Sequence, residues 1–127
     1  MSLSSIQAAK ILVQISSYGL TKTQLFAMIF ISDYVFNKRY GHHLINDTLI
    51  PHAYLPYNQK LNDKIFGYGT NNVKNVFRSI DIDNVSKLES QILFECYSIY
   101  KDEPDYILYS IINRIDQNIK NEEQILI

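Results

Sequence analysis

The chain has 127 residues, of which 46% are apolar and 20% are charged, and this composition excludes an intrinsically disordered protein. The length predicts a single domain spanning residues 1–127. The net charge of −1 and the pI of about 6.3 lack the basic excess typical of nucleic-acid-binding domains. A single cysteine, Cys96, excludes an internal disulfide and favours a reducing compartment. Because no apolar run is long enough for a membrane span and no signal-peptide pattern is present, we expect a cytoplasmic protein with no membrane association.

The first predicted helix begins near residue 5. Ser4 or Ser5 supplies the N-cap, and apolar residues follow at helical spacing. Gly19 is expected to end this helix, because glycine is the residue most often found just after a helix C-terminus.

The second predicted helix is the most apolar segment of the chain. Thr21 or Thr23 is expected to cap it, and residues 25–36 are apolar almost all round, which is typical of a buried central helix. Phe30 is therefore predicted to be buried. Gly41 is expected to end the helix.

Residues 42–56 form the least regular part of the sequence. Two short extended pieces are expected around Asn46 and Asp47, which give a weak hairpin signal. Pro51 and Pro56 exclude a continuing helix. We expect a short irregular or small β insert here.

The remaining sequence predicts four more helices, over residues 57–66, 73–80 and 86–101 and from Pro104 onward. The predicted buried face of the helix over 86–101 comprises Leu88, Ile92, Leu93, Cys96 and Ile99, and that of the last helix comprises Tyr106, Ile107, Ile111, Ile115 and Ile119. The expected fold is therefore mainly α-helical, with about six helices in one compact domain.

The three histidines lie close together with one carboxylate: His42, His43, His52 and Asp47. A helical zinc site requires ligands four residues apart on one face, and adjacent histidines do not meet this requirement. We therefore interpret them as loop residues and expect no metal ligand. Cys96 falls on an apolar helix face, where cysteine behaves as a small hydrophobic residue. No catalytic motif is present, so we expect neither catalytic residues nor a cofactor.

Asp33 lies inside the most apolar helix, where a carboxylate is costly unless it is hydrogen-bonded. One interpretation is that it fixes the backbone of the following loop, and the other is that it contacts a partner. The ten tyrosines exceed what a core of this size requires, which favours a protein interface. A local basic patch is a weaker possibility, formed by Lys22, Lys38, Arg39, Lys74 and Arg78.

The segment TKTQLFAMIFISDYVFNKRYGHHLINDTLIPHAYLP resembles the conserved half of the Panacea domain, the SocA-like antitoxin family of bacteria and their phages. The matching residues are Leu25 and residues 28–33 in the helix, Tyr40-Gly41 and Leu44-Ile45 in the turn, and Tyr54 with Pro56 at the end. The segment over residues 86–115 is similar to the C-terminal helix pair of that family. The sequence departs from the family pattern at Ala27, at Pro51-His52 and at Leu55.

This resemblance implies a non-enzymatic, mostly helical domain that binds a protein, usually a toxin encoded beside it. The expected partner-binding residues are Asp33, Tyr54, Pro56 and Tyr57, and the expected loop-shaping residues are Gly41, Asp47 and Pro51. Two alternatives remain open: a nucleic-acid-binding regulator, against which the neutral charge counts, and an enzyme.

Overall fold

The computed structural model describes residues 2–16, 20–47, 49–52, 55–65, 77 and 79–125, with the backbone alone at 50–52, 55, 57 and 123–125. The elements are α1 Ser5–Ile15, α2 Lys22–Tyr40, β1 Ile50–His52, β2 Leu55–Tyr57, α3 Gln59–Ile65, α4 Lys87–Tyr100 and α5 Asp105–Ile125. The fold is mainly α-helical, as the sequence predicts, and the described residues hold five helices. The sixth predicted helix, over residues 73–80, lies mostly outside them, although Phe77 is described and buried.

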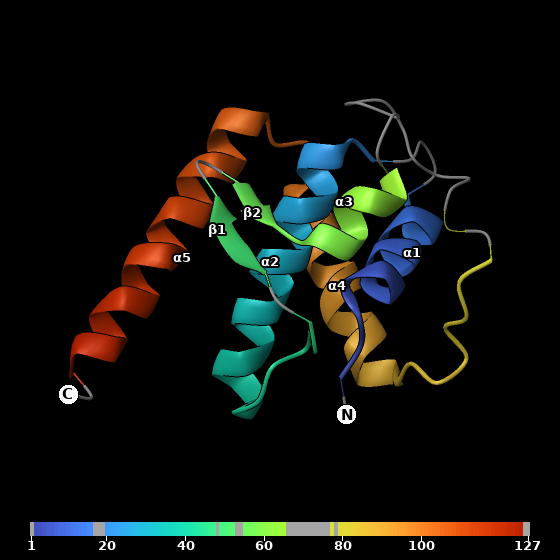
Figure 1. Cartoon of the computed structure of the whole chain (residues 1–127), viewed down its shortest axis with the longest axis horizontal. Coiled ribbons are helices and arrows are strands. Elements are labelled where there is room, and N and C mark those ends of the chain that lie inside the picture. The colour runs from blue at the N-terminus through green and yellow to red at the C-terminus, as the bar shows by residue number, and fades with distance from the viewer. Residues whose placement is uncertain are drawn as a thin grey trace.

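α2 is the central element of the fold (Figure 1). It contacts α1, α4, α5 and β2, so that nearly its whole circumference is covered. Ten of its nineteen residues are buried, and Phe30 is only 8% exposed, which confirms the predicted central helix. In the part of the chain that the structure describes, none of the helices combines the length and the apolar character needed to cross a membrane.

Three helices begin with a capping box, in which a hydroxyl and a side chain three residues later satisfy two exposed backbone N–H groups. The pairs are Ser4 with Gln7 in α1, Thr21 with Gln24 in α2, and Ser86 with Glu89 in α4. The structure thereby selects Ser4 and Thr21 from the predicted alternatives. α1 ends at Ile15 with Ser16 as its C-cap, before the predicted end at Gly19, which lies outside the described residues.

The β insert is a small antiparallel hairpin in front of α2 (Figure 1). Its register pairs Ile50 with Tyr57, Pro51 with Pro56, and His52 with Leu55. The predicted position of the hairpin, around Asn46 and Asp47, is therefore wrong. These two residues bond to the N-terminal segment instead, Asn46 to Leu3 and Asp47 to Ser5. Two prolines are tolerated here because the hairpin has only two strands. Each strand therefore has one edge without a neighbouring strand, and no backbone N–H is needed along that edge.

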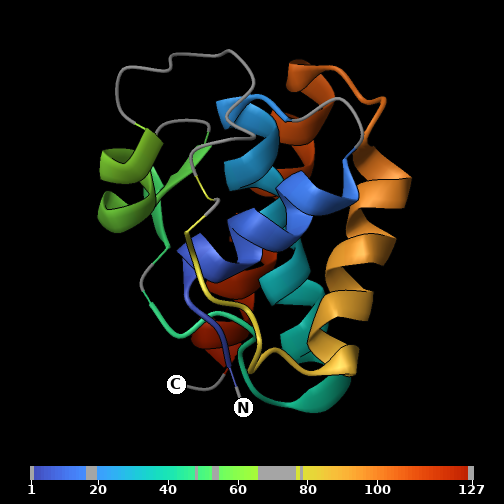
Figure 2. The ribbon, with the colours of Figure 1, turned by 90° about the vertical axis from the view of Figure 1, so that its right-hand side faces the viewer.

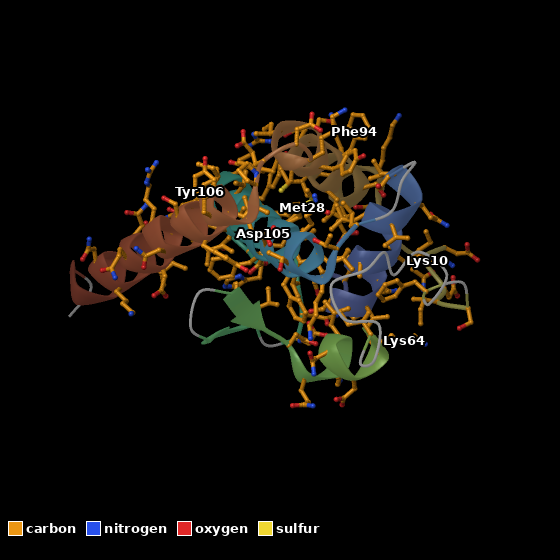
Figure 3. The ribbon with its side chains drawn as sticks, turned by 90° about the horizontal axis from the view of Figure 1, so that it is seen from above. Lys10, Met28, Lys64, Phe94, Asp105 and Tyr106 are labelled. Atoms are coloured by element: carbon orange, nitrogen blue, oxygen red, sulfur yellow. The ribbon has the colours of Figure 1, made fainter. Side chains whose placement is uncertain are left out.

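Three positions that were predicted to be buried in α4 and α5 are exposed. Leu88 and Ile99 are 43% and 64% exposed, because both lie about a quarter-turn from the centre of the buried stripe of α4. Tyr106 is 70% exposed. Ile115 is buried as predicted, Ile111 and Ile119 pack partly buried against the core, and Leu108 and Ile112 complete the buried stripe of α5. Figure 3 shows Tyr106 near the start of α5, whereas Met28 lies among the helices in the interior.

Candidate functional site

Asp33 fixes the loop that follows α2. Its carboxylate accepts a hydrogen bond from the backbone N–H of Ile45 at 3.0 Å and contacts Nδ1 of His43 at 3.0 Å. The Asp33 side chain is only 16% exposed. The interpretation of Asp33 as a tether for the loop is thereby confirmed, and its contact with a partner stays a prediction.

Asp47 holds the same loop against the first helix. Both of its carboxylate oxygens accept the backbone N–H of Ser5, at 3.1 and 3.2 Å, and one also accepts the Ser5 hydroxyl. Ser5 is the first residue of α1, whose first turn carries no acidic residue of its own. Asp47 therefore supplies the negative charge that a helix N-terminus favours.

A short parallel bridge completes the attachment of this loop to the N-terminal segment. The backbone N–H of Leu3 donates to the carbonyl of Leu44 at 2.9 Å, and the carbonyl of Leu3 accepts the N–H of Asn46 at 2.8 Å. Gly41 begins the loop at φ 78°, a left-handed conformation that side-chain-bearing residues rarely adopt. A Cβ there would meet no neighbouring atom, so the backbone conformation and not the packing explains the glycine. The loop over residues 41–47, which includes His42 and His43, is thus held in a fixed position.

Three of the other predicted site residues belong to the hairpin. Pro51 lies in β1, while Pro56 and Tyr57 lie in β2; Pro56 is buried. Tyr54 and the side chain of Tyr57 lie outside the described residues, so their contact with a partner stays a prediction. Both prolines lie within the paired strands of the hairpin, and a small β insert was one of the two forms expected for this region.

The histidines do not form a metal site in the described structure. His42 places Nδ1 3.2 Å from the carbonyl of Tyr40, and His43 contacts Asp33. Among the side chains that the structure describes, no group of three histidine, cysteine or acidic residues could hold a metal ion. The side chain of His52 lies outside that set.

Two members of the predicted basic patch are paired with carboxylates from distant helices. Lys38 contacts Glu122 of α5, and Arg39 contacts Glu95 of α4 at 2.9 Å. Lys74 and Arg78 lie outside the described residues. Each of these two cations has a carboxylate beside it, which offsets its positive charge. Lys38 and Arg39 therefore do not form a basic surface that would bind phosphate groups.

Cys96 is buried between α4 and α2, as the sequence predicts. Its thiol donates to the carbonyl of Met28 at 3.5 Å, and burial raises its pKa from 9.0 to about 12. A cysteine nucleophile requires the opposite change, because the thiolate is the reactive form. Cys96 is therefore a structural residue.

This raised pKa predicts a slow reaction of Cys96 with the thiol reagent DTNB. At about pH 8 the thiolate fraction should be lower in the native protein than in the unfolded chain by roughly a thousandfold. The native reaction rate should fall accordingly, relative to that in denaturing guanidinium chloride. Because the unfolded chain loses this proton first, stability should decline as the pH rises from 9.0 toward about 12. If Cys96 reacted with DTNB at comparable rates in the native and the unfolded protein, its thiol would not be buried.

An apolar groove of about 520 Å³ lies between α1 and α4. Three isoleucines from different parts of the chain contribute to it: Ile11 and Ile15 of α1, and Ile82 from the segment before α4. That segment is attached to α1, because the Gln7 amide donates to the carbonyl of Asp81 at 3.1 Å and Lys10 contacts the carbonyl of Ile80. Figure 2 shows α4 along one edge of the molecule, beside α1 and α2.

Phe94 lines the α4 side of this groove together with Lys87, Ser90 and Gln91, and it is 54% exposed. Figure 3 shows where Phe94 lies. The groove is bordered by the exposed polar residues Gln14, Lys87 and Gln91. Among the described residues, no carboxylate pairs with Lys87. Apolar and aromatic side chains next to polar ones are the usual composition of a protein-binding surface.

Sequence reasoning did not identify this groove. One signal was available: Phe94 lies two residues from both Ile92 and Cys96, and so falls on the opposite side of an amphipathic helix. A large aromatic residue on a polar helix face is a candidate contact residue. Ile82 carries no such signal, because only the folded chain brings it beside α1.

Comparison with protein-family models, with curated proteins and with solved structures finds no match to this chain. The resemblance to the Panacea domain therefore stays a hypothesis that rests on the motif residues given above.

Proposed function

We propose that this chain is a non-enzymatic protein-binding domain of the cytoplasm, and that the groove between α1 and α4 receives its partner. The partner is a small toxic protein encoded beside it, in the manner of the antitoxins that the sequence resembles. The observation that carries the proposal is the apolar groove with Phe94 half-exposed at its side.

The chemistry of the groove defines the segment that fits it. Two helices and an attached loop line this apolar surface, and a surface between helices suits one face of an amphipathic helix. Lys87 is the charged residue of the lining and has no carboxylate partner within the described part of the chain. The partner segment should therefore present apolar anchors next to an aspartate or glutamate.

Phe94→Ala should weaken binding of the protein encoded by the adjacent gene at least about thirty-fold, because aromatic anchors at the centre of an interface contribute about 2 kcal/mol or more. The melting curve should change little, since exposed substitutions shift stability by about 0.5 kcal/mol. Isothermal titration with that purified protein measures the affinity. Tyr106→Ala is the matched control, because it removes a more exposed aromatic residue from α5, outside the groove.

Reversing the charge of Lys87, measured by the same titration, tests whether the partner presents an acidic group to the groove. Lys87→Glu should weaken binding, and it should not destabilise α4, because an acidic residue at a helix N-terminus is favourable. Lys60→Glu is a suitable control, since Lys60 also lies in the first turn of an α-helix but outside the groove. If Phe94→Ala and Tyr106→Ala weakened the affinity equally, or if neither changed it, the groove would not be the binding site of the partner.

A further inference from the structure

A second and smaller cavity, of about 100 Å³, lies between α2 and α4. Ser32 and Cys96 are buried at its inner end. Arg39 and Glu95 lie at its solvent side, where their side chains are 50% and 40% exposed and form an ion pair of 2.9 Å. No residue of this cavity lines the groove between α1 and α4, so the two are separate features.

Ser32 is the unusual residue of this cavity. It is fully buried, and within the described structure its hydroxyl oxygen has no hydrogen-bond partner. A serine within a helix can donate to the carbonyl four residues earlier, but the Ser32 hydroxyl does not make this bond, and the Met28 carbonyl accepts the Cys96 thiol. The Ser32 hydroxyl lies near the Cys96 thiol and partly offsets the increase of the thiol pKa. The two groups do not, however, have the geometry of a hydrogen bond.

A buried hydroxyl without a partner destabilises a fold, and such groups in native proteins commonly face a water or a ligand. The remaining lining is mostly apolar, with Val35, Ile92 and Tyr100 among its members. The ion pair at the mouth brings two opposite charges together and therefore favours no net charge on a ligand. Shape, polarity and charge thus all restrict what this cavity can hold.

We propose that the cavity between α2 and α4 binds a small neutral molecule, mostly apolar, with one hydroxyl group that hydrogen-bonds to Ser32. The cavity is smaller than the dry engineered cavity of about 150 Å³ that accepts benzene, which limits the ligand to roughly four or five heavy atoms. An alcohol of three or four carbon atoms meets these requirements. This site is independent of the protein-binding groove.

Isobutanol and isobutyl chloride form a matched pair of probes, because they share the carbon skeleton but only the alcohol carries a hydroxyl. Titration of the isotope-labelled protein should give saturable amide shifts at residues 31–35 and 92–99, with a dissociation constant in roughly the millimolar range. Isobutanol should bind at least about tenfold more tightly than isobutyl chloride, since only the alcohol can satisfy the buried hydroxyl.

Ser32→Ala should remove this preference while leaving the weak binding of isobutyl chloride in place. A thermal melt should show that Ser32→Ala is at least as stable as the parent chain, because the unpaired hydroxyl is gone. Phe94→Ala should bind both probes as the parent chain does. Shifts that do not saturate, an alcohol preference that survives in Ser32→Ala, or shifts centred on residues 11–15 would each overturn the proposal.

Discussion

Phe26→Ala should lower the free energy of unfolding by about 3–5 kcal/mol, which is a large share of the roughly 5–15 kcal/mol that stabilises an ordinary domain. Phe26 lies in α2, is 1% exposed, and ranks among the largest fully buried side chains of the chain. The substitution removes a buried ring and leaves a cavity that a helix packed on several sides cannot close. Denaturant unfolding followed by circular dichroism measures the change.

Phe94→Ala provides the matched comparison for this experiment, because it makes the same chemical change at a half-exposed position of α4. It should change the unfolding free energy by only about 0.5 kcal/mol. A loss below about 1 kcal/mol for Phe26→Ala, or similar losses in both variants, would show that α2 is not the centre of the core.

Asp47→Ala should lower the free energy of unfolding by about 3 kcal/mol. The carboxylate accepts both the backbone N–H and the hydroxyl of Ser5, which is fully buried at the start of α1. Truncation leaves two buried donors without an acceptor and removes a negative charge from a helix N-terminus. Chemical denaturation of the two proteins, measured side by side, gives the difference.

Two further variants separate this contact from a general effect of losing a carboxylate. Asp63→Ala removes an exposed carboxylate that accepts the Gln59 amide at 2.7 Å, and it should change stability by only about 0.5 kcal/mol. In a double-mutant cycle, Asp47 and Ser5 should show a coupling energy of about 1 kcal/mol or more. Additive losses would mean that the Ser5 hydroxyl contributes little and that Asp47 acts through the backbone N–H of Ser5, which every variant keeps.

The sequence by itself determined the helical class and several helix boundaries. Ser4 and Thr21 cap helices because each is followed by a glutamine three residues later, and this contact spans less than one turn of chain. Gly41 ends α2 because the left-handed conformation there disfavours any side chain. The burial of α2 was predictable as well, since an apolar surface on every side requires neighbours on every side.

The tertiary structure alone decided which donors the carboxylates of Asp33 and Asp47 meet, and which predicted core positions of α4 and α5 are exposed. The sequence indicated that Asp33 could fix the following loop, but its donor lies twelve residues away and that of Asp47 forty-two residues away, and no local pattern encodes such a distance. Asn46 bonds to Leu3 of the N-terminal segment, and the hairpin forms at residues 50–57.

The candidate groove shows the same division between local and long-range information. Helical periodicity could mark Phe94 as lying off the buried stripe of α4, but it could not supply the other side of the groove. Ile11 and Ile82 are separated by seventy-one positions in the chain and meet only because Gln7 and Lys10 attach the segment before α4 to α1. A groove is a property of surfaces that pack side by side, so its existence depends on how the helices dock rather than on which residues form them.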